Sequence, residues 1–338
     1  MDSKDLTKVQ KDREEKLKIL REKGFNYPNK FEKKDYLGEI SSKFSKSSKS
    51  SLEDKKVSIC TAGRIVLKRV MGNAAFMTLE DSSGRLQIFL SRNKLNEKLD
   101  EAKDLDLGDI IGVKGILFRT NTDELTVDLD SFELLTKSLK PMPEKHKGLT
   151  DIETIYRKRY LDLMSNPESR EVFIKRNKII KSLRANLESN GFLEVETPMM
   201  HPIPGGANAR PFETHHNALD KKLYLRVAPE LYLKRLLVGG YEKVFEINRN
   251  FRNEGISTIH NPEFTMLEFY EAYGDLQRTA KFIQKLIQDS IIVVNDSLKI
   301  TYDQKNINFE KDFEIRSLKE LVKEELNVES LENEEDIF

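Results

Sequence analysis

The stretch from Phe245 to Tyr270 constrains the fold most, because its side chains alternate like those of two β-strands around a polar loop. Gly255 and Pro262 mark the loop between the strands. If the strands pair, one sheet face carries a guanidinium, two carboxylates, an aromatic ring and a phenol, from Arg252, Glu254, Phe264, Glu268 and Tyr270. Such a face makes a poor core and a good binding surface.

Each of these residue types has a chemical use. An arginine binds phosphate or carboxylate through a bidentate fork. Phe264 offers a stacking plane for a purine, and Glu268 and Tyr270 can receive an ammonium group. His260 and Asn261 lie on the loop, within reach of more distant phosphates. The alternative interpretation is a solvent-exposed edge hairpin whose charges pair among themselves.

The run NRNFRNEG followed by HNPEFT resembles the second signature motif of class II aminoacyl-tRNA synthetases, in its lysyl version. The resemblance implies that Arg252 is the catalytic residue, bridging the α-phosphate of ATP and the lysine carboxylate. By the same resemblance, Glu254 holds the adenine amino group, Phe264 stacks on the ring, and His260 and Asn261 contact the distal phosphates. The implied activity is that of a lysine–tRNA ligase with ATP, lysine and tRNA(Lys) as substrates.

The resemblance also implies a lysine pocket. Gly206 belongs to a loop of small residues that lets the backbone approach a ligand, and it would line the pocket. Glu230 lies at the positive end of a predicted helix and would hold the α-ammonium group. The implied lysine-binding residues are Gly206, Glu230, Arg252, Glu268 and Tyr270. Carboxylates suit an ammonium group, which argues against the related aspartyl and asparaginyl synthetases.

Composition places few limits on function. The 338 residues contain 57 basic and 57 acidic side chains, so the net charge does not indicate a nucleic-acid partner. Cys60 is the only cysteine, which excludes an internal disulfide and favours the reducing cytoplasm. We expect no signal segment and no membrane span. The sequence also lacks a GxxxxGK phosphate loop, so ATP binding must rest on another fold.

An OB-fold barrel is predicted upstream, because five strand candidates carry one helical insert, 93–105, after the third strand. The strand candidates are 57–70, 75–79, 86–90, 110–118 and 125–135. Phe76 can stack on an unpaired base and Gln87 can read a base edge. The alternatives are barrel packing for Phe76 and plain solvent exposure for Gln87. This region resembles the anticodon-binding domain of lysyl-tRNA synthetases, which implies that Phe76, Gln87 and Glu133 read the anticodon.

Together these features predict a multidomain α+β protein. An OB-fold β-barrel is followed by an incomplete class II catalytic domain with an antiparallel sheet. A helix over 167–190, a strand and Pro198 resemble the first class II motif, which implies a homodimer through 168–198. The predicted parts are an N-terminal helical extension with a Ser/Lys-rich linker at 43–51 (1–50), the OB-fold (51–138), a hinge (139–160) and the catalytic part (161–338).

After Tyr273 the sequence predicts a helix over 275–290, strands near 291–294 and 298–302, and an acidic tail. The Gly-rich third class II motif is absent, and so are the Mg²⁺-binding acids that precede it. A partial gene product and a shortened paralogue remain open, and so does a tRNA-binding, dimerising protein without synthetase activity. We expect segment 50–140 to fold alone. His201, His215 and His216 have no carboxylate side chains placed to bind a metal ion with them, so no metal site is expected there.

Overall fold

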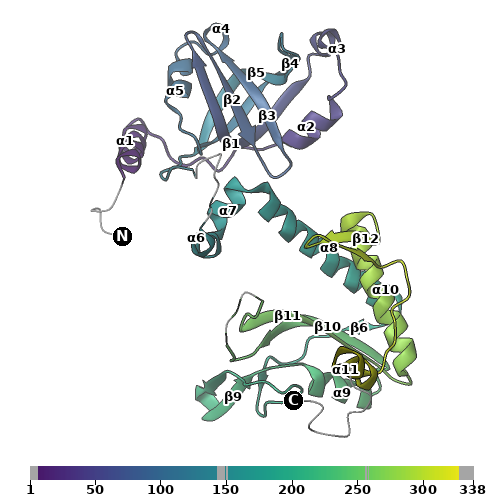
Figure 1. Ribbon diagram of the computed structural model, residues 1–338. Helices are drawn as coiled ribbons and strands as arrows, with labels where there is room; N and C mark the ends of the chain where they lie inside the picture. Colours follow the sequence, from purple (N-terminus) through teal and green to yellow (C-terminus); the bar gives the residue numbers. More distant parts are fainter. Residues whose placement is uncertain (1–6, 143–148, 150, 256, 258, 327–338) are drawn as a thin grey trace. The chain divides into compact units, whose positions relative to one another are not determined.

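The computed structural model describes residues 7–142, 149, 151–255, 257 and 259–326. The chain forms two compact units that divide between Pro167 and Glu168 (Figure 1). The first unit contains a closed β-barrel, and the described part of the second contains three small sheets and several helices. The predicted α+β class is therefore confirmed.

The barrel of the first unit has the strand order β1-β2-β3-β5-β4, as an OB-fold requires. Neighbouring strands are antiparallel except β3 and β5, which are parallel. The predicted helical insert forms two short helices after β3. The elements are β1 (Ser58–Met71), β2 (Ala74–Glu80), β3 (Arg85–Ser91), α4 (Arg92–Leu95), α5 (Lys98–Asp104), β4 (Ile110–Arg119) and β5 (Leu125–Thr136).

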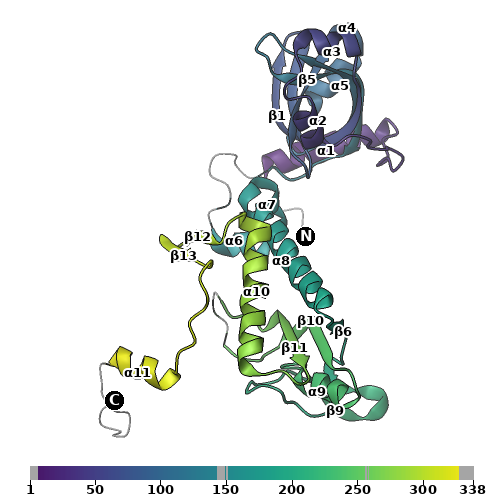
Figure 2. The same ribbon diagram turned by 90° about the vertical axis from the view of Figure 1, so that its right-hand side faces the viewer.

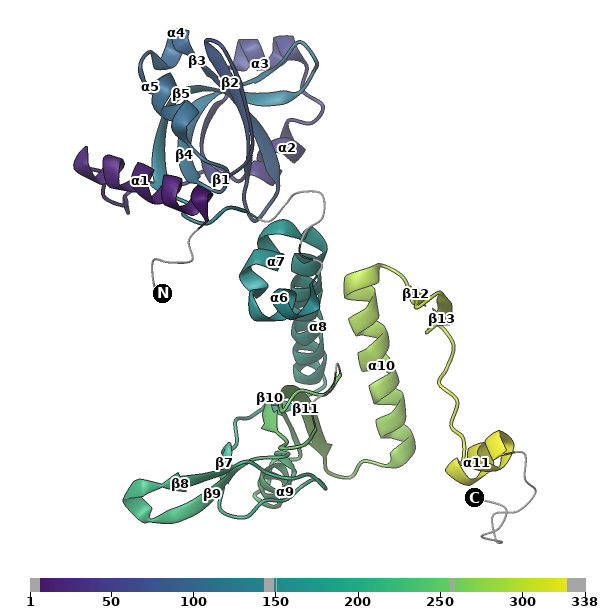
Figure 3. The ribbon, with the colours of Figure 1, turned by 60° about the vertical axis from the view of Figure 1, so that its left-hand side comes forward.

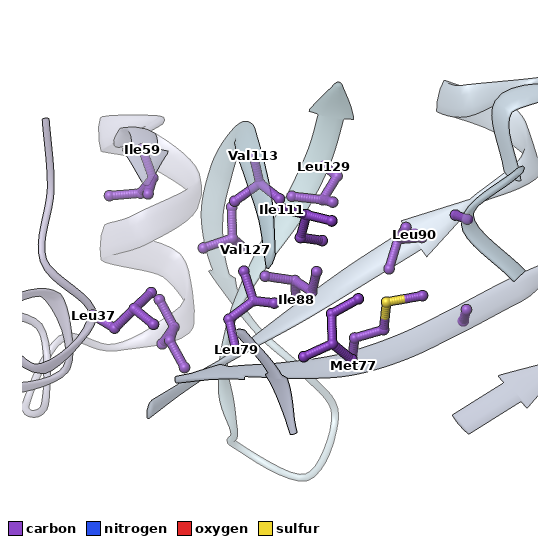
Figure 4. Packing of buried hydrophobic residues seen from close by; sticks show 14 of the residues in the cluster. Leu37, Ile59, Met77, Leu79, Ile88, Leu90, Ile111, Val113, Val127 and Leu129 are labelled. Carbon is purple, nitrogen blue, oxygen red and sulfur yellow. The ribbon is translucent and has the colours of Figure 1, made fainter. Parts of the chain in front are cut away.

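Aliphatic side chains fill the barrel, and they alternate with outward-facing residues along each strand (Figure 4). In β3, Leu86, Ile88 and Leu90 are buried, whereas Gln87 and Phe89 are only partly buried. This alternation fixes which side chains the outer face can offer to a partner.

The N-terminal residues pack on the barrel more closely than the sequence predicted. They form three helices, α1 (Lys8–Glu22), α2 (Leu37–Lys43) and α3 (Lys49–Lys55). Leu37, Ile40 and Leu52 are buried in the barrel core. The guanidinium of Arg119 donates hydrogen bonds to the backbone carbonyls of Phe44, Ser45 and Ser47. The Ser/Lys-rich stretch 43–51 is therefore held against the barrel, and its interpretation as a linker is wrong.

Two short helices end the first unit, α6 (Ile152–Arg157) and α7 (Arg159–Ser165). The sequence predicted only a hinge over 139–160, which overlaps α6. The helical backbone is interrupted at Lys158, where φ is −119° and ψ is 48°. Positions 143–148 and 150 of the predicted hinge fall outside the described residues.

The second unit is organised by the predicted hairpin, β10 and β11, to which the two-residue β6 adds in parallel. One face of the hairpin packs against α8 and α10, which flank it in Figure 2. Phe192 contributes to this core and stacks on Phe282 of α10 with a centroid distance of 5.4 Å. The elements are α8 (Pro167–Ser189), β6 (Leu193–Glu194), β10 (Lys243–Phe251), β11 (Glu263–Glu271) and α10 (Leu276–Asn295).

The opposite face of the hairpin contacts α9 (Glu230–Val238), which lies on the other side of the strands from α8 in Figure 3. A second antiparallel sheet in the order β7-β9-β8 precedes α9 in the chain. Its strands are β7 (Met200–His201), β8 (Glu213–His216) and β9 (Lys221–Leu225). The end of β9 leads directly into α9, so α9 is fixed beside the polar face of the hairpin.

The C-terminal elements differ from the prediction at several places. The β-branched run 291–294 continues α10 to Asn295, so the strand predicted there is wrong. A strong apolar stripe holds these residues in helix, and Asp296, in the left-handed conformation (φ 54°), ends it. The remaining elements are β12 (Lys299–Tyr302), β13 (Lys305–Asn308) and α11 (Leu318–Leu326).

Candidate functional site

The strand register brings the polar side chains of the hairpin to one face. Asn250 lies opposite Phe264, Glu246 opposite Glu268, and Val244 opposite Tyr270. Residues directly opposite on one sheet face are in contact range. The arrangement predicted from alternation is therefore present within the two strands.

A buried ion pair that includes Glu246 stabilises this face. Arg226 and Glu246 have 0% and 1% of their side chains exposed, and Nη1 of Arg226 lies 2.7 Å from Oε1 of Glu246. Nε of Arg226 donates a hydrogen bond to the carbonyl of Arg249 at 2.9 Å, and the hydroxyl of Thr197 donates one to Oε2 of Glu246 at 2.7 Å. The pair therefore ties together the end of β9, strand β10 and the segment after β6. Such a connection keeps the hairpin face rigid.

Arg252 follows β10 directly and sits over the aromatic ring of the hairpin. Its guanidinium carbon lies 5.2 Å from the centroid of Phe264, and its backbone N–H donates to the carbonyl of Pro262 at 2.8 Å. Nε of Arg252, Nη2 of Arg226 and Oδ1 of Asn250 are buried and have no hydrogen-bond partner among the described residues. Buried polar atoms are normally paired, so this face is suited to a polar ligand.

Glu230 of α9 lies near Glu268 and Tyr270 of β11, and we call this group of acidic and phenolic side chains the anionic pocket. The hydroxyl of Tyr270 donates to Oε1 of Glu268 at 2.7 Å. Burial raises the pKa of Glu268, the hydrogen bond from Tyr270 opposes this, and the charge of Glu230 raises it further. Burial and the neighbouring Glu268 likewise raise the pKa of Tyr270. A cationic ligand would relieve the repulsion between these acidic groups.

Gly206 contributes space to this anionic pocket. Its φ of +90° is unfavourable for other residues, and a Cβ atom added there would lie 3.0 Å from Cβ of Glu230. The structure therefore brings together Gly206, Glu230, Glu268 and Tyr270, which the sequence placed in the lysine pocket.

Three predicted ATP-binding residues lie apart from this group. Glu254, His260 and Asn261 are exposed in the segment that joins β10 and β11. Nδ1 of His260 is 2.8 Å from the hydroxyl of Ser257. Within the described part of the loop, these three side chains form no hydrogen bond or ion pair with Arg252 or Phe264, so their ATP-binding roles stay predictions.

Two predicted anticodon-binding residues share a groove on the barrel. Phe76 and Gln87 face outward and line a cavity of about 400 Å³ together with Lys68, Arg69 and Glu124. The outward orientation of Phe76 excludes packing inside the barrel. Nε2 of Gln87 donates to the hydroxyl of Thr126 at 3.0 Å, which fixes the orientation of its amide.

Glu133 does not line this groove. It lines a separate cavity of about 500 Å³ next to α1, beside Lys16 and Lys137. The acidic side chain that lines the groove with Phe76 and Gln87 is that of Glu124, which directly precedes β5. The sequence offered a signal for Glu124, because it adjoins the predicted turn before the fifth strand.

His201 and His215 form hydrogen bonds with residues close to them in the sequence. His201 is buried, its Nε2 lies 2.8 Å from the carbonyl of Pro198, and burial lowers its pKa. His215 contacts Asn217 and Asp220. Among the described residues, no group of three His, Cys, Asp or Glu side chains is arranged to hold a metal ion. Within the same part of the chain, no helix is long and apolar enough to cross a membrane.

Several residues of the site had not been singled out from sequence. Alternation had already placed Glu246 and Asn250 on the polar face, but it gave no reason to expect their burial. Arg226 directly follows β9, and no local sequence pattern indicates its contact with Glu246, which only the fold creates. Lys234 lies one helical turn after Glu230, and this spacing was the available signal for their contact.

Comparisons with known proteins agree with both parts of this picture. The family model "tRNA synthetases class II (D, K and N)" matches residues 151–336, and the model "OB-fold nucleic acid binding domain" matches residues 59–135. The first match covers more than half of the chain.

Curated relatives from several bacteria are named lysine–tRNA ligases. The protein of Legionella pneumophila (strain Lens) is 54% identical over 310 residues, which are 92% of this chain and 62% of the relative. The Chromobacterium violaceum protein is 51% identical over 322 residues, which are 95% of this chain and 64% of the relative. The Thiobacillus denitrificans protein is 52% identical over 324 residues. The chain thus spans 62–64% of the length of the first two relatives.

Proposed function

Because this chain belongs to the class II tRNA synthetases of the D, K and N group, we propose that it carries the lysine-activating site and the anticodon-binding domain of a lysine–tRNA ligase. The observation that carries the proposal is the anionic pocket, in which Glu230 of α9 lies near Glu268 and Tyr270 of the hairpin that also carries Arg252. The pocket suits an ammonium group, and the guanidinium suits a carboxylate or a phosphate. These are the charged groups of lysine and ATP.

In the proposed reaction, a carboxylate oxygen of lysine attacks the α-phosphorus of ATP, and pyrophosphate leaves. The terminal ribose hydroxyl of tRNA(Lys) then attacks the carbonyl of lysyl-adenylate, and AMP leaves. Such phosphoryl chemistry depends on positioning and charge stabilisation more than on a protein nucleophile. Arg252 would bridge the lysine carboxylate and the α-phosphate and stabilise the charge that develops there.

The other residues would position the two substrates. Glu230, beside Gly206, would receive the α-ammonium of lysine, and Glu268 with Tyr270 would confine its side chain. Phe264 would stack on adenine. The loop residues that would contact ATP are Glu254, His260 and Asn261.

The family also implies Mg²⁺ with ATP. The described residues offer no group of carboxylates or imidazoles that fits a metal ion, so we assign no step to Mg²⁺ on this part of the chain.

Amino-acid selectivity tests the lysine assignment. We expect a non-hydrolysable lysyl-adenylate analogue to bind this chain at least ~10-fold more tightly than the aspartyl and asparaginyl analogues, because an aspartyl carboxylate would face Glu230 and Glu268. Isothermal titration calorimetry of the three analogues gives the measurement. The asparaginyl analogue is the matched control, since it has nearly the shape of the aspartyl one without its charge. Tighter binding of either rival would refute the lysine assignment.

The barrel groove supports tRNA recognition through the anticodon. Phe76 offers a partly buried ring beside Phe89, with a centroid distance of 4.8 Å, and the exposed Arg69 on the same groove could contact backbone phosphates. Gln87 and Glu124 would read base edges. For Glu133 the sequence-based assignment remains a prediction, and its position in another cavity favours Glu124 as the acidic partner.

Replacing Phe76 with alanine is expected to weaken binding of a lysine tRNA anticodon stem-loop by roughly 1–3 kcal/mol, the contribution of one stacking contact. Fluorescence anisotropy with a labelled stem-loop measures the change. The same variant should bind the lysyl-adenylate analogue like the unmodified chain, since the two sites are on different units. An equal loss of both ligands would mean that Phe76 only supports folding.

A second candidate function is tRNA binding and dimerisation without lysine activation. It is favoured by the barrel, whose strands close fully and whose groove is complete within 37–138. Binding of the stem-loop together with failure to bind any adenylate analogue would select this alternative.

We further propose a homodimer in the cytoplasm. The first class II motif, 168–198, includes α8, on which Val172 is 62% exposed although it belongs to the apolar stripe of the helix. Exposed apolar side chains of this kind are typical of protein interfaces. The single Cys60 suits a reducing compartment.

A further inference from the structure

Lys234 places an ammonium group in the anionic pocket. Its Nζ lies 2.5 Å from Oε1 of Glu230, one helical turn earlier on α9. The same Nζ lies 5.8 Å from the ring centroid of Tyr270 on β11. Its positive charge also acts on Glu268 and lowers the pKa of that carboxyl group against the raising effect of burial. One lysine side chain thus interacts with every acidic or phenolic group of the pocket.

An ordinary surface pair does not account for this arrangement. A Glu–Lys pair one turn apart on an exposed helix interacts only with its own helix and contributes little to stability. Lys234 also reaches across to another element, where the face of Tyr270 adds a cation–π contact. Because Glu230 and Glu268 would otherwise repel each other, the ammonium group of Lys234 compensates their charge in the absence of ligand.

The ammonium group of Lys234 is the same functional group that the pocket would receive from free lysine. Its side chain is 55% exposed, so it can turn into solvent without leaving a buried charge unpaired. Oε1 of Glu230 cannot hold both ammonium groups in the same position.

We propose that Lys234 is a resident ammonium that occupies the lysine pocket in the free protein and that substrate lysine must displace. This inference rests on the proposed function, because it takes the anionic pocket to be the lysine site. Lys234 then acts as a positioning residue. Its ammonium group compensates the negative charges of Glu230 and Glu268 in the free protein, at the cost of some affinity for lysine.

The test is equilibrium binding of free lysine to the 338-residue chain and its variants by isothermal titration calorimetry. Lys234→Met, which keeps length and removes charge, is expected to bind lysine about 3- to 10-fold more tightly, as the loss of one partly exposed ion pair and one cation–π contact predicts. Lys234→Arg keeps the charge and should bind like the unmodified chain. Lys285→Met removes an equivalent one-turn pair with Asp289 on α10 and is the matched control.

A spectroscopic measurement separates displacement from a structural effect. In protein labelled with ¹³C-lysine, the side-chain signal that disappears in Lys234→Met should move towards the position of a solvent-exposed lysine when unlabelled lysine is added. The Lys285 signal should not move. An unmoved Lys234 signal, or unchanged or weaker lysine binding by Lys234→Met while the unmodified chain binds lysine, would overturn the inference and leave the proposed function intact. Lysine binding by none of these proteins would overturn the proposed function itself.

Discussion

Replacing Arg252 with alanine is expected to weaken binding of a lysyl-adenylate analogue to this chain by at least ~100-fold. The analogue contains the carboxyl and phosphate groups that Arg252 would bridge, and charge-assisted hydrogen bonds contribute about 1.5–3 kcal/mol each. Nε of Arg252 is already buried without a partner among the described residues, so a ligand oxygen there adds a bond and removes a desolvation penalty. Calorimetric titration of both proteins gives the two dissociation constants.

The same strand supplies a control for this experiment. Arg249 lies on the other face of β10 and is half exposed, and it forms a 3.5 Å ion pair with Glu263. Arg249→Ala removes the same charge from the same hairpin and should leave analogue binding within about 2-fold, as expected for a surface substitution. Near-normal binding by Arg252→Ala would remove Arg252 from the proposed mechanism. Equal losses in both variants would indicate a general effect of net charge.

The sequence allowed the binding face to be predicted because a strand has a period of two. Once the residues around Phe264 were recognised as a strand, the positions of Glu268 and Tyr270 on one face followed, and the register agrees. Period alone cannot predict what packs over that face. Contacts such as Arg226 with Glu246 join residues 20 positions apart through the fold, so local patterns contain no trace of them.

Errors in the fold prediction have two physical causes. At 291–294 the β-branched residues favoured a strand, but α10 continues through them to Asn295, because extending an existing helix needs no new nucleation and outweighs a weak propensity. At 43–51 the composition favoured a flexible linker, but Arg119, far along the chain, binds three carbonyls of that stretch. The barrel strands were predicted within one residue at each end, because each has its own alternation and its own turn.

The packing of α2 changes the expectation for an isolated barrel. A segment that begins at residue 50 lacks Leu37 and Ile40, which are 0% and 4% exposed in the barrel core. Full burial of such a side chain contributes about 1.5–3 kcal/mol. We therefore expect segment 50–140 to be less stable than segment 28–140 by about 3–6 kcal/mol, and the shorter one to be largely unfolded if the longer one is marginal. Urea unfolding followed by circular dichroism measures both.

Asp81 provides a second, independent part of this test. Its carboxylate accepts hydrogen bonds from the backbone N–H of Leu37 at 2.9 Å and from Nζ of Lys33 at 2.5 Å. Although burial raises the pKa of Asp81, these bonds and those from Ser83 lower it to about 2. Because an unfolded aspartate has a pKa of about 3.9, this stabilisation is complete above that pH and is lost as the pH falls towards 2. The advantage of segment 28–140 should therefore shrink between pH 4 and pH 2.

Within segment 28–140, Leu37→Ala should reproduce about 2–5 kcal/mol of the difference at neutral pH. Equal unfolding midpoints for the two segments would show that the barrel core does not need α2.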